Sequence, residues 1–148
     1  MTSIELNGQW KMKDIKKKEW INAHVPGSVF LDLLNAGKAP DPYYRDNEDK
    51  IAPLFREAYE YSREFLVRRE VLKYDKVMLC CEGLDTLSKI SLNGREIANT
   101  NNIAQDVSVR CKRPVTRRHE HNTYRFLLTR SVCGEKGCRK QWHVFNGW

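Results

Sequence analysis

Apolar and polar residues alternate along several stretches of the chain. Leu6, Trp10 and Met12 share one parity and polar residues fill the other, which predicts a strand with one buried face. Residues 61–67, 88–92, 107–111 and 123–129 show the same alternation, and residues 77–81 are apolar at every position, as in a central strand. Many short strands separated by turn signals predict an all-β protein built as an antiparallel β-sandwich.

One hairpin can be placed closely. The strand pattern ending at Leu92 is followed by Asn93-Gly94, and an apolar and polar mixture resumes at Arg95. Asn-Gly supplies the two positive-φ positions of a type I′ turn, so this dipeptide predicts a two-residue connection between antiparallel strands.

The stretch after Pro26-Gly27 predicts one short helix near residues 28–36. Ser28 is suited to cap its N-terminus, apolar residues follow with helical spacing, and Gly37 stands where a C-terminal glycine belongs. Residues 38–50, "KAPDPYYRDNEDK", are expected to form a polar loop. Residues 51–59 are ambiguous, because Pro53 interrupts a helix there.

Length and cysteine content give the broad class. The 148 residues suffice for one domain with a core, and no apolar run is long enough to span a membrane. The first residues show no secretory signal pattern. Five cysteines, two of them the adjacent Cys80 and Cys81, make a poor disulfide framework, so we expect reduced thiols and a cytoplasmic location.

Positive charge is concentrated near the C-terminus. The net charge is +7, and residues 110–148 hold ten Lys and Arg against two Asp and Glu. Such a segment can bind nucleic acid or another polyanion. A basic surface strand and loop is the favoured interpretation, so no nucleic-acid partner is expected.

Candidate metal and cofactor sites are weak. Cys133 and Cys138 bracket "GEKG", and a zinc site would need two more ligands from Cys111, His119, His121 or His143, at a spacing that matches no standard pattern. His24 is interpreted as a loop residue. No Ser/His/Asp set and no phosphate-binding glycine loop is visible, so neither a metal nor a cofactor is predicted.

The carboxylates of the chain are weak candidates for catalytic residues. Asp46 and Glu48 lie in the polar loop beside Arg45, which favours solvated carboxylates, and Asp85 is placed to bond a turn backbone. No catalytic residue is predicted.

Four aromatic residues could stack on a sugar ring. Trp10 belongs to the apolar face of a strand, so core packing is the stronger interpretation for it, whereas Trp20 carries no such signal. Tyr43 and Tyr44 are better stacking candidates, with anchoring of their loop onto the sandwich as the equal alternative.

Three motifs carry a resemblance. "LNGQWKMKD", "HVPGSVFLDLLNAGKAPDPYYRDNE" and "CEGLDTLSKISLNGREIANTNN" occur in the order and at about the spacing found in β-mannosidases of glycoside hydrolase family two, over residues 6–102. The chain resembles their N-terminal domain. That resemblance implies a jelly-roll β-sandwich of the galactose-binding type, near the pocket for terminal β-linked mannose.

The resemblance extends to the C-terminal stretch "RKQWHVFNGW". Phe145, Gly147 and Trp148 resemble the start of the family's pocket motif, with Asn146 inserted, so Trp148 is the one substrate-binding candidate. The two catalytic glutamates of the family lie on a barrel for which this chain has no matching motif.

The domain expectation follows from these motifs. Residues 1–132 would form the sandwich and residues 133–148 a truncated segment of the same domain, which we expect to pack weakly and to leave a sheet edge open for self-association. The chain is expected to be a fragment of a β-mannosidase-like hydrolase, and to meet a β-mannoside only within the full-length enzyme. The alternatives are a free-standing carbohydrate-binding module and, less favoured, a polyanion binder.

Overall fold

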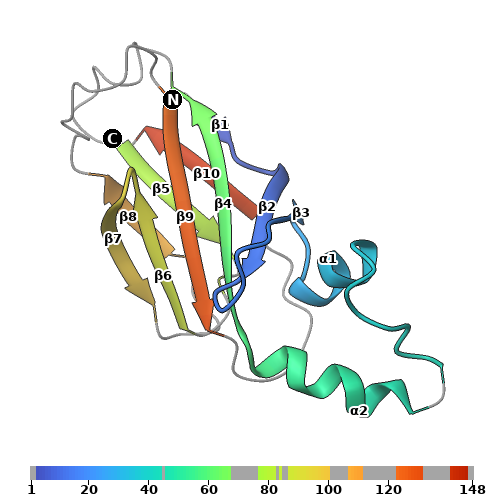
Figure 1. Cartoon of the computed structure of the whole chain (residues 1–148). Helices are drawn as coiled ribbons and strands as arrows, with labels where there is room; N and C mark the ends of the chain where they lie inside the picture. Colours follow the sequence, from blue (N-terminus) through green and yellow to red (C-terminus); the bar gives the residue numbers. More distant parts are fainter. Residues whose placement is uncertain are drawn as a thin grey trace.

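A computed structural model of the chain describes residues 3–44, 46–67, 77–82, 84, 87–100, 107–111, 123–131 and 141–146. These residues form two antiparallel sheets and a helical segment between β3 and β4, residues 26–57, which we call the excursion (Figure 1). The strands are β1 Ser3–Glu5, β2 Gly8–Asp14, β3 Ile21–Val25, β4 Ala58–Leu66, β5 Val77–Glu82, β6 Leu87–Leu92, β7 Arg95–Thr100, β8 Val107–Cys111, β9 Thr123–Ser131 and β10 Gln141–Asn146. All the strands predicted from alternation are present.

The two sheets share one hydrophobic core. Strand order is β1-β10-β5-β8 in the four-stranded sheet and β3-β2-β4-β9-β6-β7 in the six-stranded sheet. Met12 and Ile90 of the larger sheet are fully buried in one cluster with Cys81 of the smaller sheet. Trp10 also belongs to this cluster, with 3% of its surface exposed, and its indole Nε1 donates to the Leu6 carbonyl at 2.8 Å. The prediction that Trp10 is a core residue is confirmed.

The predicted hairpin is confirmed. β6 and β7 pair in antiparallel register with Leu92 opposite Arg95. Asn93 and Gly94 have φ of 52° and 78°, the left-handed backbone that a type I′ turn requires.

Helix α1, Val29–Asn35, lies where the sequence predicts it. The Ser28 hydroxyl accepts from the Leu31 amide at 3.2 Å, and Gly37 takes a positive φ of 66° after the helix. The turn that leads into α1 contains a cis Val25–Pro26 bond. A Cβ at Gly27 would lie 2.3 Å from the His24 carbonyl oxygen, so this turn requires glycine.

The expectation of a single helix is wrong. α2, Asn47–Ile51, and the 3₁₀ helix η1, Ala52–Arg56, follow the polar loop. Pro53 falls in the first turn of η1, where a missing N–H leaves no bond unmade, so the proline begins a helical turn there. None of the helices that the structure describes is both long and apolar enough to span a membrane.

The excursion is tied to the larger sheet through Asp32. This α1 carboxylate is 3% exposed and accepts hydrogen bonds from the His24 amide and the Tyr61 hydroxyl, both at 3.0 Å. It therefore joins α1 to β3 and β4 in one contact.

The C-terminal strand is an inner strand. β10 pairs with β1, where Phe145 lies opposite Ser3, and with β5, where Phe145 lies opposite Met78. Residues 141–146 are thus paired on both sides, whereas the expected weak packing of residues 133–148 concerns side chains outside the described part of the chain. The edges of the smaller sheet are β1 and β8.

Candidate functional site

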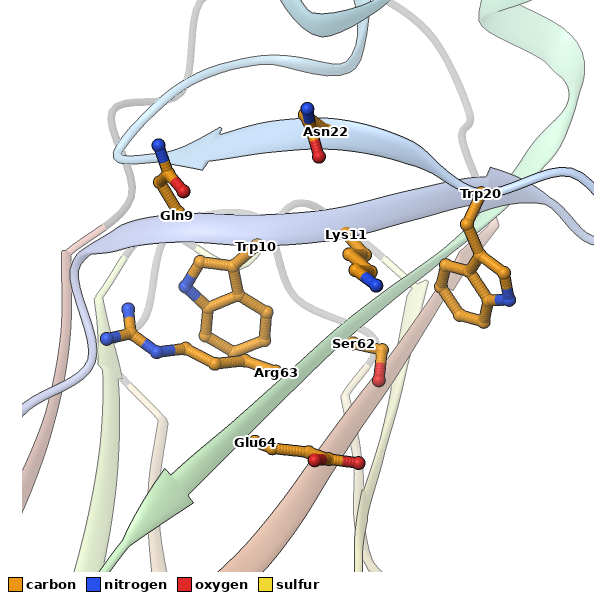
Figure 2. Close-up of a pocket in the computed structure, with 8 residues that line it drawn as sticks. All are labelled: Gln9, Trp10, Lys11, Trp20, Asn22, Ser62, Arg63 and Glu64. Carbon is orange, nitrogen blue, oxygen red and sulfur yellow. The ribbon is translucent and has the colours of Figure 1, made fainter.

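A polar hollow lies on the outer face of the six-stranded sheet, over β2, β3 and β4 (Figure 2). Its volume is about 520 Å³. We call it the outer-face hollow, and the residues that line it are Gln9, Trp10, Lys11, Trp20, Asn22, Ser62, Arg63 and Glu64. Gln9 and Trp20 lie at its opposite ends in Figure 2.

Strand register places these side chains together. Lys11 of β2 lies opposite Asn22 of β3 on one side and Ser62 of β4 on the other. Gln9 lies two residues before Lys11 on β2, and Glu64 lies two residues after Ser62 on β4. Both share this face because side chains alternate along a strand. The hollow is therefore formed mainly by three neighbouring strands, and Trp20 of the β2–β3 connection completes one end of it.

Trp10 and Arg63 have the opposite parity and a structural role. One Nη of the Arg63 guanidinium donates to the carbonyl oxygens of Leu6 and Asn7, both at 2.7 Å. The guanidinium carbon also lies 5.9 Å from the centroid of the Trp10 ring. Burial lowers the pKa of Arg63. Its hydrogen bonds are thus directed to the backbone beside β2.

Trp20 is half-buried at the end of the hollow and is held in place. The Lys13 ammonium lies 4.7 Å from the ring centroid, a cation–π contact, and the same ammonium pairs with Glu60 at 3.4 Å. The Glu60 carboxylate thus holds the Lys13 ammonium, and the ammonium restrains the Trp20 indole from one side.

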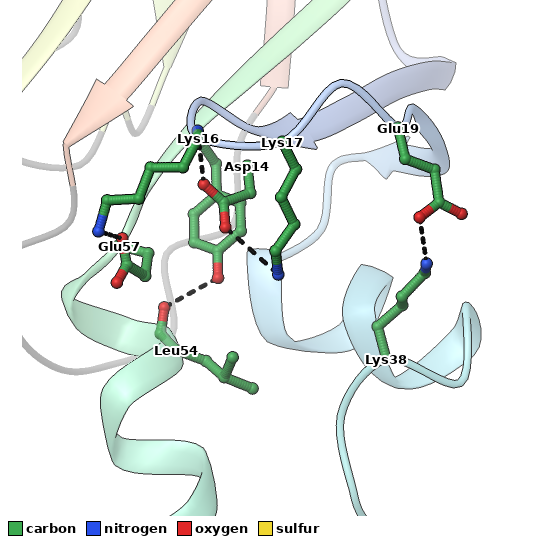
Figure 3. Close-up of polar contacts among 8 residues, drawn as sticks. Asp14, Lys16, Lys17, Glu19, Lys38, Leu54 and Glu57 are labelled. Atoms are coloured by element: carbon green, nitrogen blue, oxygen red, sulfur yellow. Dashed lines mark hydrogen bonds and ion pairs between the residues drawn. The ribbon is translucent and has the colours of Figure 1, made fainter.

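A second hollow of about 100 Å³ lies between the β2–β3 connection, α1 and η1. Ion pairs surround it (Figure 3): Lys16 with Glu57 at 2.5 Å, Lys17 with Asp14 at 3.5 Å and Lys38 with Glu19 at 2.6 Å. The Lys16–Glu57 and Lys38–Glu19 pairs connect the excursion to the β2–β3 connection, whereas the Lys17–Asp14 pair is local to the end of β2.

The pKa direction of Glu19 shows that the charged form of this carboxylate is favoured beside the second hollow. Hydrogen bonding to Lys38, together with its charge, lowers the pKa of Glu19, and the bond to Glu57 raises the pKa of Lys16. Burial raises the pKa of Tyr59, whose hydroxyl donates to the Leu54 carbonyl at 3.0 Å, to about 12. A general acid near neutral pH needs a raised carboxyl pKa, so Glu19 is unsuited to that role.

The excursion carries exposed aromatic residues. Tyr43 is 96% exposed, so it is not buried against the sandwich and the anchoring alternative is wrong for it. Tyr44 is 59% exposed. Phe55 is 40% exposed and lies beside Phe30, with ring centroids 5.7 Å apart.

The other candidates divide between the described and undescribed parts of the chain. Asp46 is exposed, and His24 lies within β3, which corrects its interpretation as a loop residue. Cys80 is half-buried and Cys81 is buried, and the two are not joined in a disulfide. Among the described residues no three of His, Cys, Asp and Glu are grouped as a metal site would need. Outside the described residues are Asp85, His119, His121, Cys133, Cys138 and Trp148, together with the side chains of Glu48, Cys111 and His143.

Most of the chain matches the sequence pattern of a known protein family. Residues 10–140 match the family described as glycosyl hydrolase 2 galactose-binding domain-like. The chain belongs to this family. The galactose-binding-like domain accounts for the mostly β architecture, its antiparallel sheets and two short helices.

Relatives of the chain include β-mannosidases of animals and fungi. The chain is 32% identical to β-mannosidase of Capra hircus over 103 residues, which is 70% of this chain and 12% of that protein. It is 28% identical to β-mannosidase B of Aspergillus niger over 151 residues, 96% of this chain and 18% of that protein. The chain therefore spans a small part of the proteins it matches.

Solved structures of glycoside hydrolases contain a domain with a similar fold. The crystal structure of β-D-mannosidase from Dictyoglomus thermophilum aligns with a TM-score of 0.80 and 35% identity over 87% of this chain and 15% of that one. A β-glucuronidase from Ruminococcus gnavus aligns with a TM-score of 0.66 at 12% identity, which shows the shared fold alone.

Sequence reasoning missed most of the outer-face hollow of this galactose-binding-like domain. Trp20 was a candidate, but Gln9, Asn22 and Glu64 were not. The available signal was strand parity, which puts Gln9 and Lys11 on the polar side of β2, and it did not show that β3 and β4 flank them.

Proposed function

We propose that the chain acts as a non-catalytic N-terminal domain of a β-mannosidase-like glycoside hydrolase that removes terminal β-linked mannose. The observation that carries this is the alignment with the Dictyoglomus thermophilum β-mannosidase, at 35% identity and a TM-score of 0.80. The glucuronidase-type relatives share the fold at much lower identity. The two antiparallel sheets, with β10 between β1 and β5, support a jelly-roll β-sandwich as the finer architecture.

The chemistry of the described acids supports a non-catalytic role. Retaining hydrolysis needs two carboxyl groups about 5–5.5 Å apart, one of them protonated. The outer-face hollow is lined by one carboxylate, that of Glu64. The second hollow is lined by Asp14 and Glu19, each paired with a lysine. In this proposal the catalytic carboxyl groups belong to another part of the enzyme.

A domain exchange tests the proposal. The matching N-terminal region of the Dictyoglomus thermophilum enzyme is replaced by this chain, and hydrolysis of an aryl β-mannoside is measured. We expect the exchanged enzyme to fold and to retain measurable activity, because the domain would present the correct surfaces to the remainder of that enzyme.

The matched control carries the corresponding domain of the Ruminococcus gnavus β-glucuronidase, which has the same fold at 12% identity to this chain. That exchange is expected to abolish activity. Equal activity in the two exchanged enzymes would show that the fold alone suffices. A folded but inactive enzyme carrying this chain would refute the β-mannosidase assignment.

A further inference from the structure

The outer-face hollow holds hydrogen-bonding capacity that the described part of the chain does not use. Gln9, Lys11, Asn22 and Glu64 are all exposed, and no described residue forms a hydrogen bond or ion pair with any of these four side chains. Together they offer two amides, an ammonium and a carboxylate around one space. Such a set can donate to and accept from several hydroxyl groups at once.

Trp20 adds an apolar surface to this polar set. Its ring lines the hollow at the end opposite Gln9, and the Lys13–Glu60 pair restrains it from one side. A restrained indole loses little conformational freedom when a ligand packs against it. The C–H face of a pyranose ring is an apolar surface of similar size, whereas its edge carries the hydroxyl groups.

The charged side chains of the outer-face hollow influence which kind of saccharide can bind there. The Arg63 guanidinium is directed to the backbone carbonyls of Leu6 and Asn7, which leaves Lys11 and Glu64 as the charges that can face a ligand. These two side chains have opposite signs, so a neutral ligand can bond to both, whereas an anionic ligand would meet the carboxylate of Glu64. The volume of about 520 Å³ lies within the range of small-molecule sites.

We propose that the outer-face hollow binds a neutral oligosaccharide. One sugar ring packs on Trp20, and the hydroxyl groups bond to Glu64, Lys11 and the amides of Gln9 and Asn22. A carboxylate and an ammonium form stronger hydrogen bonds with hydroxyls than neutral groups do, so Lys11 and Glu64 supply most of the specificity. The inference rests on the geometry of β2, β3 and β4 and holds whether or not the chain serves a β-mannosidase.

Isothermal titration of the full chain with β-1,4-linked mannotriose tests the inference. We expect saturable binding with one site per chain, and weaker binding of a trigalacturonate of similar size, because its carboxylates meet Glu64. Trp20→Ala and Glu64→Gln should each weaken binding by about tenfold or more, the effect of one charge-assisted hydrogen bond or one stacked ring.

The control variant is Tyr43→Ala, which removes an exposed aromatic ring from the excursion. It is expected to bind as the wild type does, and circular dichroism verifies that every variant is folded. Absence of saturable binding to the folded wild type would overturn the proposal, as would binding unchanged in both Trp20→Ala and Glu64→Gln. Either outcome leaves the domain-exchange result unaffected, so the two proposals fail separately.

Discussion

At the scale of single residues, Asp32 connects α1 to the larger sheet. It is the one acidic side chain that is buried among those described, and it receives the His24 amide and the Tyr61 hydroxyl. A buried carboxylate that loses a donor is left with part of its desolvation uncompensated. The contact therefore stabilises the position of α1 on the sheet.

Tyr61→Phe tests this contact. It removes one donor to Asp32 and leaves the buried ring in place, so we expect a loss of about 1–2 kcal/mol in the free energy of unfolding, measured by urea denaturation. Tyr43→Phe removes the same hydroxyl from a side chain that is 96% exposed and is expected to change stability by less than about 0.5 kcal/mol. Equal effects of the two substitutions would contradict a structural role for the Tyr61–Asp32 bond.

At the scale of elements, the β6–β7 hairpin depends on its turn. An added Cβ at Gly94 would meet no atom within 4 Å, so a substitution there is penalised only by the backbone conformation. We expect Gly94→Val to destabilise the chain by at least about 1 kcal/mol, because a β-branched residue is strained at positive φ.

Gly94→Asn is the matched variant for this turn. Asparagine tolerates the left-handed region, so thermal denaturation should show a smaller loss than for Gly94→Val. If the two variants were equally stable, the positive φ at residue 94 would not be what selects glycine.

The elements also show where local reasoning succeeds. Ser28 and Gly37 mark the ends of α1 and Asn93-Gly94 mark the hairpin, because capping and positive-φ turns are decided by a few adjacent residues. The sequence pattern does not predict α2 and η1, because a proline such as Pro53 usually interrupts a helix. Its position in the first turn of η1, which depends on where the preceding helix ends, makes it compatible with a helix.

At the scale of the whole molecule, long-range pairing is what the sequence left undetermined. The pattern predicts strands, but it does not show that β10 inserts between β1 and β5, or that β3, β2 and β4 are neighbours. The outer-face hollow depends on that second fact. Its residues lie within 56 positions of one another in the sequence but become a site only through the register of Lys11 with Asn22 and Ser62.

We expect this galactose-binding-like domain to supply no catalytic acids of its own. The most direct measurement is the release of aglycone from an aryl β-mannoside by the purified 148-residue chain, compared with a mock purification from cells lacking its gene. We expect no release above that blank. Turnover that co-purifies with the chain and is abolished by Glu19→Gln or Asp46→Asn would contradict this expectation.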